Sequence, residues 1–97
     1  MRLKNKVAAI TGAGSGIGEA AAKLFATEGA HVMILELNEA AGQRVADMIG
    51  EQATFIQTDV SDHKSVERAF AQIEQQFKRL DVLYNNASIF LGGFIIQ

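Results

Sequence analysis

The sequence contains no cysteine, no proline and no long apolar run. Without cysteine, the chain cannot form a disulfide, a thiolate nucleophile or a zinc–thiolate site, and it fits a reducing compartment. Its longest apolar stretch, residues 90–96, includes two glycines and is far shorter than the roughly 20 residues of a membrane-spanning helix. The apolar run at residues 7–10 is also shorter than the ~7–15 residues that an export signal needs. We therefore expect a soluble, cytoplasmic protein that does not associate with membranes.

Basic residues are neither in excess nor clustered. The chain of 97 residues has 9 Lys and Arg against 11 Asp and Glu, for a formal net charge of −2. This balance argues against nucleic acid as a partner. With 48% hydrophobic and 21% charged residues, the composition is that of an ordinary globular protein. Because no proline-rich linker or repeat divides the sequence, we expect residues 1–97 to form one domain.

Short apolar runs alternate with segments of helical periodicity. The predicted strands cover residues 6–11, 31–35 and 53–57, with a fourth inside 80–85, and the predicted helices cover residues 17–28, 39–49 and about 62–77. Such alternation is typical of a parallel sheet with helices on its faces. Right-handed crossovers restrict the topology, and a nucleotide-binding sheet would order these strands 3-2-1-4. We predict an α/β, Rossmann-like fold of three layers with about four parallel strands.

Polar residues and glycines mark the ends of the predicted helices. Asn38, and either Ser61 or Asp62, can accept hydrogen bonds from the first amides of a helix, whereas Gly29 and Gly50 stand where helices end. The first helix has an apolar stripe at positions 17, 20, 21, 24 and 25. The third helix has a stripe formed by Val66, Ala69, Phe70, Ile73 and Phe77.

Four glycines lie within TGAGSGIG, residues 11–18, directly after the first predicted strand. Glycine tolerates positive φ and lets a ligand approach the backbone, because it has no Cβ. The following helix directs its unpaired amides and its positive dipole end over the turn, which suits a pyrophosphate. The GxGxxG pattern is not met because position 17 is Ile17, whereas TGxxxGxG fits with Gly12, Gly16 and Gly18. A tight turn that binds no ligand is the alternative interpretation.

An acidic residue, Glu36, ends the second predicted strand. A carboxylate at this point can accept hydrogen bonds from the ribose of an adenosine. It would also repel a 2′-phosphate by about 4 kcal/mol at ~4 Å and an effective dielectric constant of ~20. Neither Ser15 nor Leu37 offers a positive charge to that phosphate. The sequence therefore predicts NAD in preference to NADP, unless Glu36 is simply a solvated surface residue.

The sequence resembles the short-chain dehydrogenase/reductase family over essentially its whole length. TGAGSGIG, Glu36, Asp59-Val60 and Asn85-Asn86-Ala87 occur in the order and at the spacing of that family. Taken alone, Asp59 would be read as a helix cap. The resemblance implies instead that Asp59 and Val60 contact the adenine ring, and that the Asn-Asn-Ala element steadies the sheet and lines the adenosine side of the pocket.

The set of residues expected to bind the cofactor combines the glycine turn with these family elements. It comprises Gly12, Ser15, Gly16, Ile17, Gly18, Glu36, Asp59, Val60, Asn86 and Ala87. One position departs from the family pattern, because Ser88 stands where the family usually has glycine. If that position requires positive φ, the substitution costs on the order of 1 kcal/mol and displaces a wall of the pocket.

The catalytic residues that the resemblance implies are not in this sequence. In the family a Tyr-x-x-x-Lys pair transfers the proton, aided by a Ser and a further Asn, and these residues follow the Asn-Asn-Ala element. Tyr84 is the only tyrosine, it belongs to a predicted strand, and Ser88 rather than lysine follows four positions later. No cluster of histidines and carboxylates has metal-ligand spacing. We therefore expect neither catalytic residues nor a metal site in this chain.

These observations predict the cofactor-binding part of a truncated dehydrogenase. The full-length form would use NAD(H) to oxidise an alcohol or reduce a carbonyl compound, and this chain alone would be inactive. The strand at residues 82–85 would leave an unpaired edge next to the apolar residues 89–97. Because such an edge pairs readily with another chain, we also expect self-association.

Two alternatives belong to other functional classes. The chain could be a stand-alone nucleotide-binding module that acts as a sensor or regulatory subunit without catalysis. It could also bind S-adenosylmethionine as a methyltransferase does, because Gly12, Gly14 and Gly16 satisfy GxGxG and an acid ends the second strand. Against the methyltransferase, Ile10 stands two positions before the first glycine, where such enzymes resemble each other in having an acidic residue.

Overall fold

Strands and helices alternate along the whole described chain. The computed structural model describes residues 2–14 and 16–86. The elements are β1 (Val7–Thr11), α1 (Gly16–Thr27), β2 (His31–Glu36), α2 (Glu39–Ile49), β3 (Ala53–Gln57), α3 (His63–Phe77) and β4 (Val82–Asn85). The predicted alternation is confirmed, and the predicted boundaries differ from these by at most two residues.

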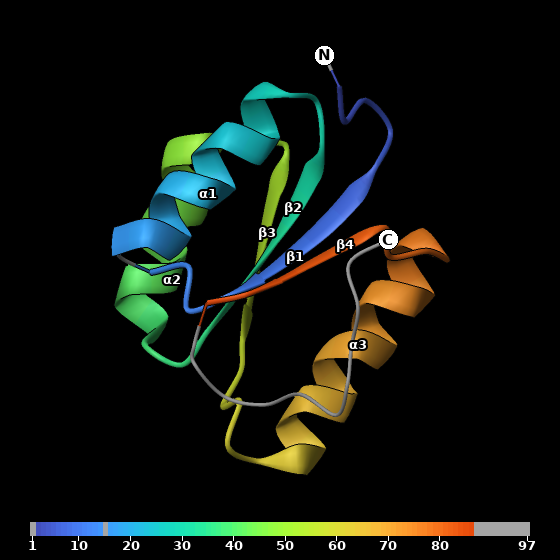
Figure 1. The fold of residues 1–97 in the computed structure, drawn as a ribbon. Helices are drawn as coiled ribbons and strands as arrows, with labels where there is room; N and C mark the ends of the chain where they lie inside the picture. The colour runs from blue at the N-terminus through green and yellow to red at the C-terminus, as the bar shows by residue number, and fades with distance from the viewer. Residues whose placement is uncertain (1, 15, 87–97) are drawn as a thin grey trace.

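The four strands form one parallel sheet in the order β3-β2-β1-β4, which confirms the predicted order. On the central strand, Ala8 of β1 pairs with Val32 of β2 on one side and with Val82 of β4 on the other. Helices α1 and α2 cover one face of the sheet and α3 covers the other (Figure 1). The fold is therefore the predicted Rossmann-like arrangement of three layers.

Strands β1 and β2 form the centre of the core, since side chains on both of their faces are buried. All five residues of β1 are buried, as expected of a central strand that is covered on both sides. Ala8 and Ile10 face the α1 and α2 layer, whereas Val7 and Ala9 face the α3 layer. This burial fixes the register, since a shift by one residue would exchange the two faces.

The predicted caps at both ends of α2 and at the start of α3 are confirmed. The Asn38 side chain caps α2 by accepting a hydrogen bond from the Ala41 amide at 2.9 Å, and Gly50 ends the helix with φ of 93°. Asp62, one of the two expected residues, caps α3 by accepting from the Lys64 amide at 3.0 Å. These caps set the positions at which α2 and α3 begin after the carboxyl ends of β2 and β3.

The predicted stripe of α1 is partly wrong. Ile17 and Leu24 are 70% and 56% exposed, and position 20 is exposed as well. The buried residues of this helix are Gly18, Ala22 and Ala26. Their spacing of four and their small size let α1 lie close to the sheet, so side-chain volume decides which face is buried. Ala21 and Phe25 pack against the same core from the border of the buried face.

The stripe of α3 and the position of Tyr84 agree with the sequence-based expectation. Ala69 and Ile73 are buried in the core beneath α3, and Phe70 and Phe77 pack against it. On the opposite face, the Tyr84 ring meets Phe25 edge-on, with 6.2 Å between the ring centroids. Within the described residues, no helix combines the length and hydropathy that a membrane span requires.

Candidate functional site

The glycine turn lies where β1 ends and α1 begins. Gly12 has φ of 65° and Gly16 has φ of 60°, a conformation that glycine adopts without the steric cost paid by other residues. The Gly12 amide donates a hydrogen bond to the Leu35 carbonyl at 2.9 Å, which ties the turn to β2. The chain can therefore leave the sheet sharply and enter α1 at Gly16, one residue before the predicted start.

Gly18 occupies the place where α1 comes closest to the turn. A Cβ added at this position would lie 2.3 Å from the Gly12 carbonyl oxygen and 2.8 Å from Asn86 Nδ2. No side chain fits there without displacing backbone. Gly16, by contrast, has open space around it and is constrained only by its positive φ. Gly16 and Gly18 are thus required for different physical reasons.

The side chain of Glu36 reaches back to the glycine turn. Its Oε1 accepts a hydrogen bond from the Gly14 amide at 2.9 Å, and its Oε2 accepts one from the Asn38 amide at 3.0 Å. A Cβ at Gly14 would approach Glu36 Oε1 to 2.7 Å and the Ala41 Cβ to 2.9 Å. Each carboxylate oxygen has a further lone pair, so hydroxyl groups of a ligand can still donate to Glu36.

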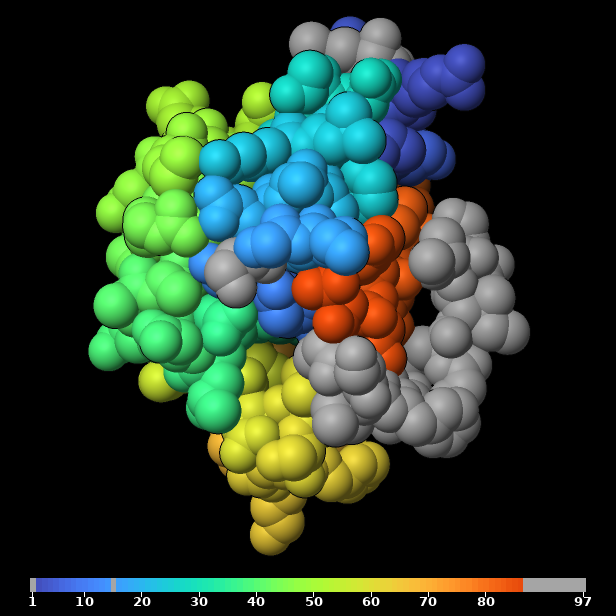
Figure 2. Space-filling model, turned by 60° about the vertical axis from the view of Figure 1, so that its left-hand side comes forward, coloured from blue at the N-terminus to red at the C-terminus, as the bar shows by residue number. Residues whose placement is uncertain are grey.

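Asn85 and Asn86 bring the end of β4 to the same place. The Thr11 hydroxyl donates to Asn85 Oδ1 at 2.9 Å and accepts from the Asn86 amide at 3.0 Å. Asn86 Nδ2 also lies 3.3 Å from the Gly12 carbonyl oxygen, to which it donates. Figure 2 shows the blue atoms of the β1–α1 segment against the orange-red atoms at the end of β4. The Asn85-Asn86 pair therefore supports the glycine turn from the side opposite to β2.

Asp59 and Val60 follow β3 at the same carboxyl edge of the sheet. The Asp59 carboxylate accepts from the hydroxyl and the amide of Ser61, at 2.6 and 3.0 Å. These hydrogen bonds lower the pKa of Asp59 below its ordinary value. The Asp59 amide donates to Ser65 Oγ at 2.9 Å. Because Asp62 caps α3, the helix-cap interpretation of Asp59 is wrong.

The structure thus gathers most of the predicted site residues at one edge of the sheet. Gly12, Gly16, Gly18, Glu36 and Asn86 surround the β1–α1 turn, and Asp59 and Val60 lie after β3, beyond β2. Ile17 belongs to the first turn of α1 and exposes its side chain. Ser15 and Ala87, together with Ser88 and the tail at 89–97, lie outside the described residues.

Two further residues of this region, Arg44 and Gly14, were not among the predicted site residues. Arg44 of α2 donates from Nη2 to the Gly14 carbonyl oxygen at 2.9 Å and to Glu19 Oε1 at 2.8 Å. Hydrogen bonds from Arg44 and Lys23 to Glu19 lower the pKa of its carboxyl group from 4.5 to about 2. No local sequence pattern indicates the contact between Arg44 and Gly14, because the two residues lie 30 positions apart. Gly14 belongs to the glycine turn and to the alternative GxGxG pattern, but it was not among the residues expected to bind the cofactor, since TGxxxGxG does not require it.

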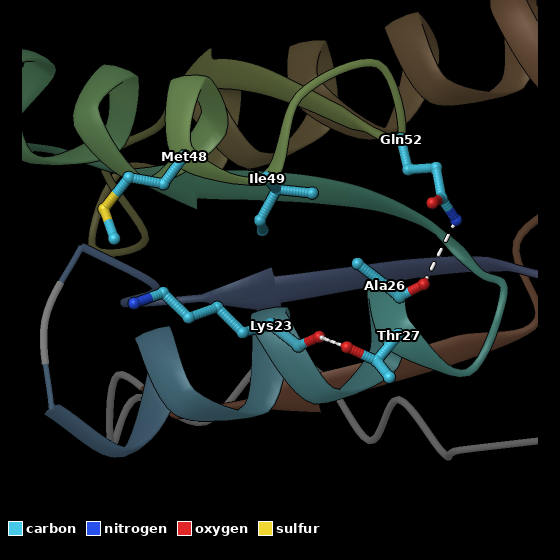
Figure 3. A pocket seen from close by; sticks show the side chains of 6 residues that line it. All are labelled: Lys23, Ala26, Thr27, Met48, Ile49 and Gln52. Carbon is cyan, nitrogen blue, oxygen red and sulfur yellow. Dashed lines mark hydrogen bonds between the residues drawn. The ribbon is translucent and has the colours of Figure 1, made fainter.

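A cleft of about 270 Å³ lies between the C-terminal halves of α1 and α2 (Figure 3). Its lining residues are Lys23, Ala26, Thr27, Met48, Ile49 and Gln52. Gln52 closes one end by donating to the Ala26 carbonyl at 3.1 Å. Because α1 and α2 end near the amino ends of the strands, this cleft is separate from the glycine turn. Among the described residues, no group of three or more metal-ligating side chains could hold a metal ion.

Comparisons with known proteins agree on one family. The family model described as short chain dehydrogenase matches residues 6–95. The chain is 41% identical to a meso-2,3-butanediol dehydrogenase of Serratia marcescens over 100% of the chain and 39% of that protein. It is 42% identical to a 3-beta-hydroxysteroid dehydrogenase of Comamonas testosteroni over 95% of the chain and 36% of that protein. The chain therefore spans less than two fifths of the length of these relatives.

The fold is also similar to that of a solved structure. A 3-ketoacyl-(acyl-carrier-protein) reductase from Brucella melitensis, crystallised as a complex with NADH, superposes with a TM-score of 0.81 at 43% sequence identity. The match covers 84% of this chain and 34% of the reductase. With a family match that takes in nearly every residue, and with the glycine turn at the head of a parallel sheet, the chain belongs to the short-chain dehydrogenase family.

Proposed function

We propose that residues 1–97 form a dinucleotide-binding domain that holds NAD(H) in preference to NADP(H). The observation that carries this proposal is the contact of Glu36 Oε1 with the Gly14 amide, at 2.9 Å. It fixes one carboxylate beside the backbone turn that would receive the pyrophosphate. The carboxylate that would bind the ribose and the turn that would bind the diphosphate are thereby connected by a hydrogen bond.

The glycine turn fits a pyrophosphate for two reasons. Gly18 leaves no side chain between the turn and the start of α1, where a Cβ would lie 2.3 Å from the Gly12 carbonyl oxygen. The first amides of α1 have no partner within the helix, and together with the helix dipole they favour an anion. Ser15 and Ile17 lie on the same short segment and are included in the proposed site on that ground.

The adenosine end of the cofactor would extend from the turn toward β3. Glu36 would accept hydrogen bonds from the ribose hydroxyls through the lone pairs that the Gly14 and Asn38 amides leave. Asp59 and Val60, at the carboxyl edge beyond β2, are proposed to contact the adenine ring. Asn86 and Ala87 would line the adenosine side of the pocket, as the family pattern implies.

The charge of Glu36 is the basis of the proposed preference for NAD. A 2′-phosphate about 4 Å from this carboxylate would be repelled by ~4 kcal/mol at an effective dielectric constant of ~20. Leu37, the next residue, is 58% exposed and apolar, so it offers no compensating charge. Since about 1.4 kcal/mol changes affinity tenfold, even a partly screened repulsion would decide between the two coenzymes.

The whole protein that carries this chain is proposed to interconvert an alcohol and a carbonyl compound. Three relatives, a butanediol dehydrogenase, a hydroxysteroid dehydrogenase and a ketoacyl reductase, have names that place them in this class of reaction. When bound, the nicotinamide coenzyme supplies the chemistry of hydride transfer. The residues of this chain would bind and orient it through the turn, Glu36 and Asn86.

This chain by itself is proposed not to catalyse the reaction. Its only tyrosine, Tyr84, is part of β4 and packs edge-on against Phe25. A ring in this position serves the core, and no lysine follows it at the spacing that the family uses. Tyr84 is therefore a packing residue. The alternative to a part of a dehydrogenase is a stand-alone module that binds a nucleotide without catalysis.

Self-association of the isolated chain is part of the same proposal. Among the described strands, β4 pairs with β1 alone and so forms the edge of the sheet (Figure 1). An unpaired strand edge presents amides and carbonyls to any other chain. Sedimentation velocity at tens of micromolar should show dimers or larger species, and a sharp monomer boundary would contradict this part.

Calorimetric titration tests the proposed function. Separate titrations of the 97-residue chain with NAD, NADP and S-adenosylmethionine should give saturable binding of NAD, weaker binding of NADP, and none of the third ligand. A dehydrogenase assay on the same sample should give no turnover. Binding of S-adenosylmethionine without NAD would favour the methyltransferase alternative, and NADP binding tighter than NAD would contradict the assigned role of Glu36.

A further inference from the structure

Both sides of the Gly14 backbone are hydrogen-bonded to side chains from distant elements. Its amide donates to Glu36 Oε1, and its carbonyl oxygen accepts from Arg44 Nη2, each at 2.9 Å. Glu36 ends β2, and Arg44 lies in the middle of α2. We call this pair of hydrogen bonds the Gly14 clamp. Its two side chains belong to consecutive elements, so β2 and α2 act together on the middle of the turn.

Arg44 is itself held in place by the start of α1. Its Nη2 lies 2.8 Å from Glu19 Oε1, and its Nη1 lies 3.4 Å from Glu19 Oε2. Glu19 is in the first turn of α1, directly after the glycine turn. The guanidinium therefore connects three parts of the molecule, which are α2, the middle of the turn and the first turn of α1.

The clamp acts on a segment that is rich in glycine. Glycine loses more backbone freedom on ordering than any other residue, and the turn has four glycines within residues 12–18. A turn that samples many conformations must be ordered when a ligand binds, and its apparent affinity falls with the fraction that is competent to bind. Two side-chain contacts on Gly14 reduce this loss before the ligand arrives.

We propose that Arg44 is a positioning residue for dinucleotide binding, which fixes the glycine turn through the Gly14 carbonyl and does not touch the ligand. This inference rests on the proposed function, in that the ligand is taken to be a nicotinamide dinucleotide. A guanidinium suits the task because its planar array of donors reaches the carbonyl and the carboxylate together. A lysine has a single ammonium on a flexible stem and would hold only part of this geometry.

A role confined to stability would have different consequences. The Arg44–Glu19 pair is partly exposed, with 49% and 18% of the two side chains accessible to solvent. Ion pairs of this kind contribute little to the stability of a folded domain. Removing Arg44 should therefore lower the melting temperature only by the few degrees that the lost hydrogen bond to the Gly14 carbonyl accounts for, while the turn loosens and the dinucleotide binds less tightly.

The chain offers a matched control in Lys23. Its ammonium lies 2.9 Å from Glu19 Oε2, so it shares the carboxylate with Arg44. In Figure 3 the side chain of Lys23 borders the cleft between α1 and α2. Replacing Lys23 removes one positive charge and one contact of Glu19, as replacing Arg44 does, but it leaves the Gly14 clamp intact.

The experiment compares Arg44→Met, Arg44→Lys and Lys23→Met with the unsubstituted chain. Calorimetry gives the Kd of NAD and of NADP, and amide hydrogen exchange by NMR follows Gly14 without ligand. For Arg44→Met we expect both Kd values to rise about 5- to 10-fold at a constant ratio, with faster exchange at Gly14. Arg44→Lys should recover part of the loss, and Lys23→Met should match the unsubstituted chain in both measurements.

The possible contrary results separate this inference from the proposed function. Normal NAD binding and unchanged Gly14 exchange in Arg44→Met would overturn the role of Arg44 alone. A changed ratio of NAD to NADP affinity would also overturn it, because Arg44 would then act on the ligand through its charge. Failure of the unsubstituted chain to bind either dinucleotide would overturn the proposed function, and this inference with it.

Discussion

Glu36 and Gly14 are 22 residues apart in the sequence, and they meet through a hydrogen bond of 2.9 Å from the Gly14 amide to Glu36 Oε1. The residue that is proposed to choose between coenzymes therefore also shapes the turn that is proposed to bind them. The second oxygen of Glu36 holds the Asn38 amide, at the start of α2. A change at Glu36 should consequently affect both the selectivity and the strength of binding.

Replacing Glu36 by glutamine should shift the coenzyme preference toward NADP. The substitution removes the charge that repels a 2′-phosphate, and we expect the ratio of NADP to NAD affinity to rise by about 10- to 100-fold. Affinity for NAD should fall at the same time, because glutamine has one acceptor oxygen where glutamate has two. Calorimetric titration with both coenzymes measures the two effects.

Glu39→Gln is the matched control for this substitution. Glu39 is an exposed acid in the first turn of α2, so its replacement changes the net charge equally. The ratio of NADP to NAD affinity should stay within about twofold of that of the unsubstituted chain, since an exposed and screened charge contributes little. An equal shift in both variants would mean that net charge rather than Glu36 sets the preference.

Alanine at Gly18 should be more damaging than alanine at Gly16. At Gly18 the new Cβ would lie 2.3 Å from the Gly12 carbonyl oxygen, and we expect a loss of about 1–3 kcal/mol in the free energy of unfolding. At Gly16 the Cβ meets open space, and the positive φ alone costs about 1 kcal/mol. Urea denaturation of both variants tests the order, and a larger loss for Gly16→Ala would contradict it.

Asn86 should tolerate alanine better than aspartate. Its Nδ2 donates to the Gly12 carbonyl oxygen at 3.3 Å, and loss of this hydrogen bond in Asn86→Ala should cost about 1 kcal/mol. In Asn86→Asp a carboxylate oxygen would face the same carbonyl oxygen, so repulsion adds to the loss. Thermal unfolding at neutral pH compares the two, and equal melting temperatures would argue against the contact with Gly12.

The elements and their order were predictable because their signals are local. The continuous apolar runs of β1 and β2, and the helix ends at Asn38 and Gly50, can be read from a few adjacent residues. Alternation and right-handed crossovers restrict the order of the strands, and the glycine turn, typical of a nucleotide-binding sheet, selects 3-2-1-4. The glycine motif is equally local, since its residues are adjacent to the end of the first apolar run, and its spacing alone places it at the first turn.

The missed features depend on contacts between distant parts of the chain. Hydropathy placed Ile17 and Leu24 on the inner face of α1, whereas close packing selected Gly18 and Ala22. The contact of Arg44 with the Gly14 carbonyl joins residues 30 positions apart, and nothing in the sequence around either residue indicates it. Such contacts follow from the path of α2 over the sheet, which a linear pattern does not specify.

His31 should make stability depend on pH in the neutral range. Burial lowers the pKa of His31 below its ordinary value of 6.5, and its Nε2 lies 2.9 Å from Thr54 Oγ1. Because the unfolded chain binds this proton more readily, the free energy of unfolding should decrease as the pH falls through 6.5 toward the lower folded pKa. Well above pH 6.5 both states are neutral, and the effect should be absent.

Denaturant titrations between pH 7.5 and 5 can isolate this contribution. His31→Gln should lose less stability over that range than the unsubstituted chain, since the group that titrates has been removed. His63→Gln, at a side chain that is 88% exposed, is the comparison that removes a histidine but leaves His31 and its contact with Thr54 in place. Identical pH profiles for His31→Gln and the unsubstituted chain would show that His31 does not contribute.

The location of the bound coenzyme tests the central claim most directly. Titration of the ¹⁵N-labelled chain with NAD should shift the amide signals of Gly12, Gly18 and Asn86, which surround the turn, and that of Asp59 after β3. Signals of residues at the cleft in Figure 3, such as Ala26 and Gln52, should stay in place. Shifts confined to that cleft, with an unchanged glycine turn, would contradict the account.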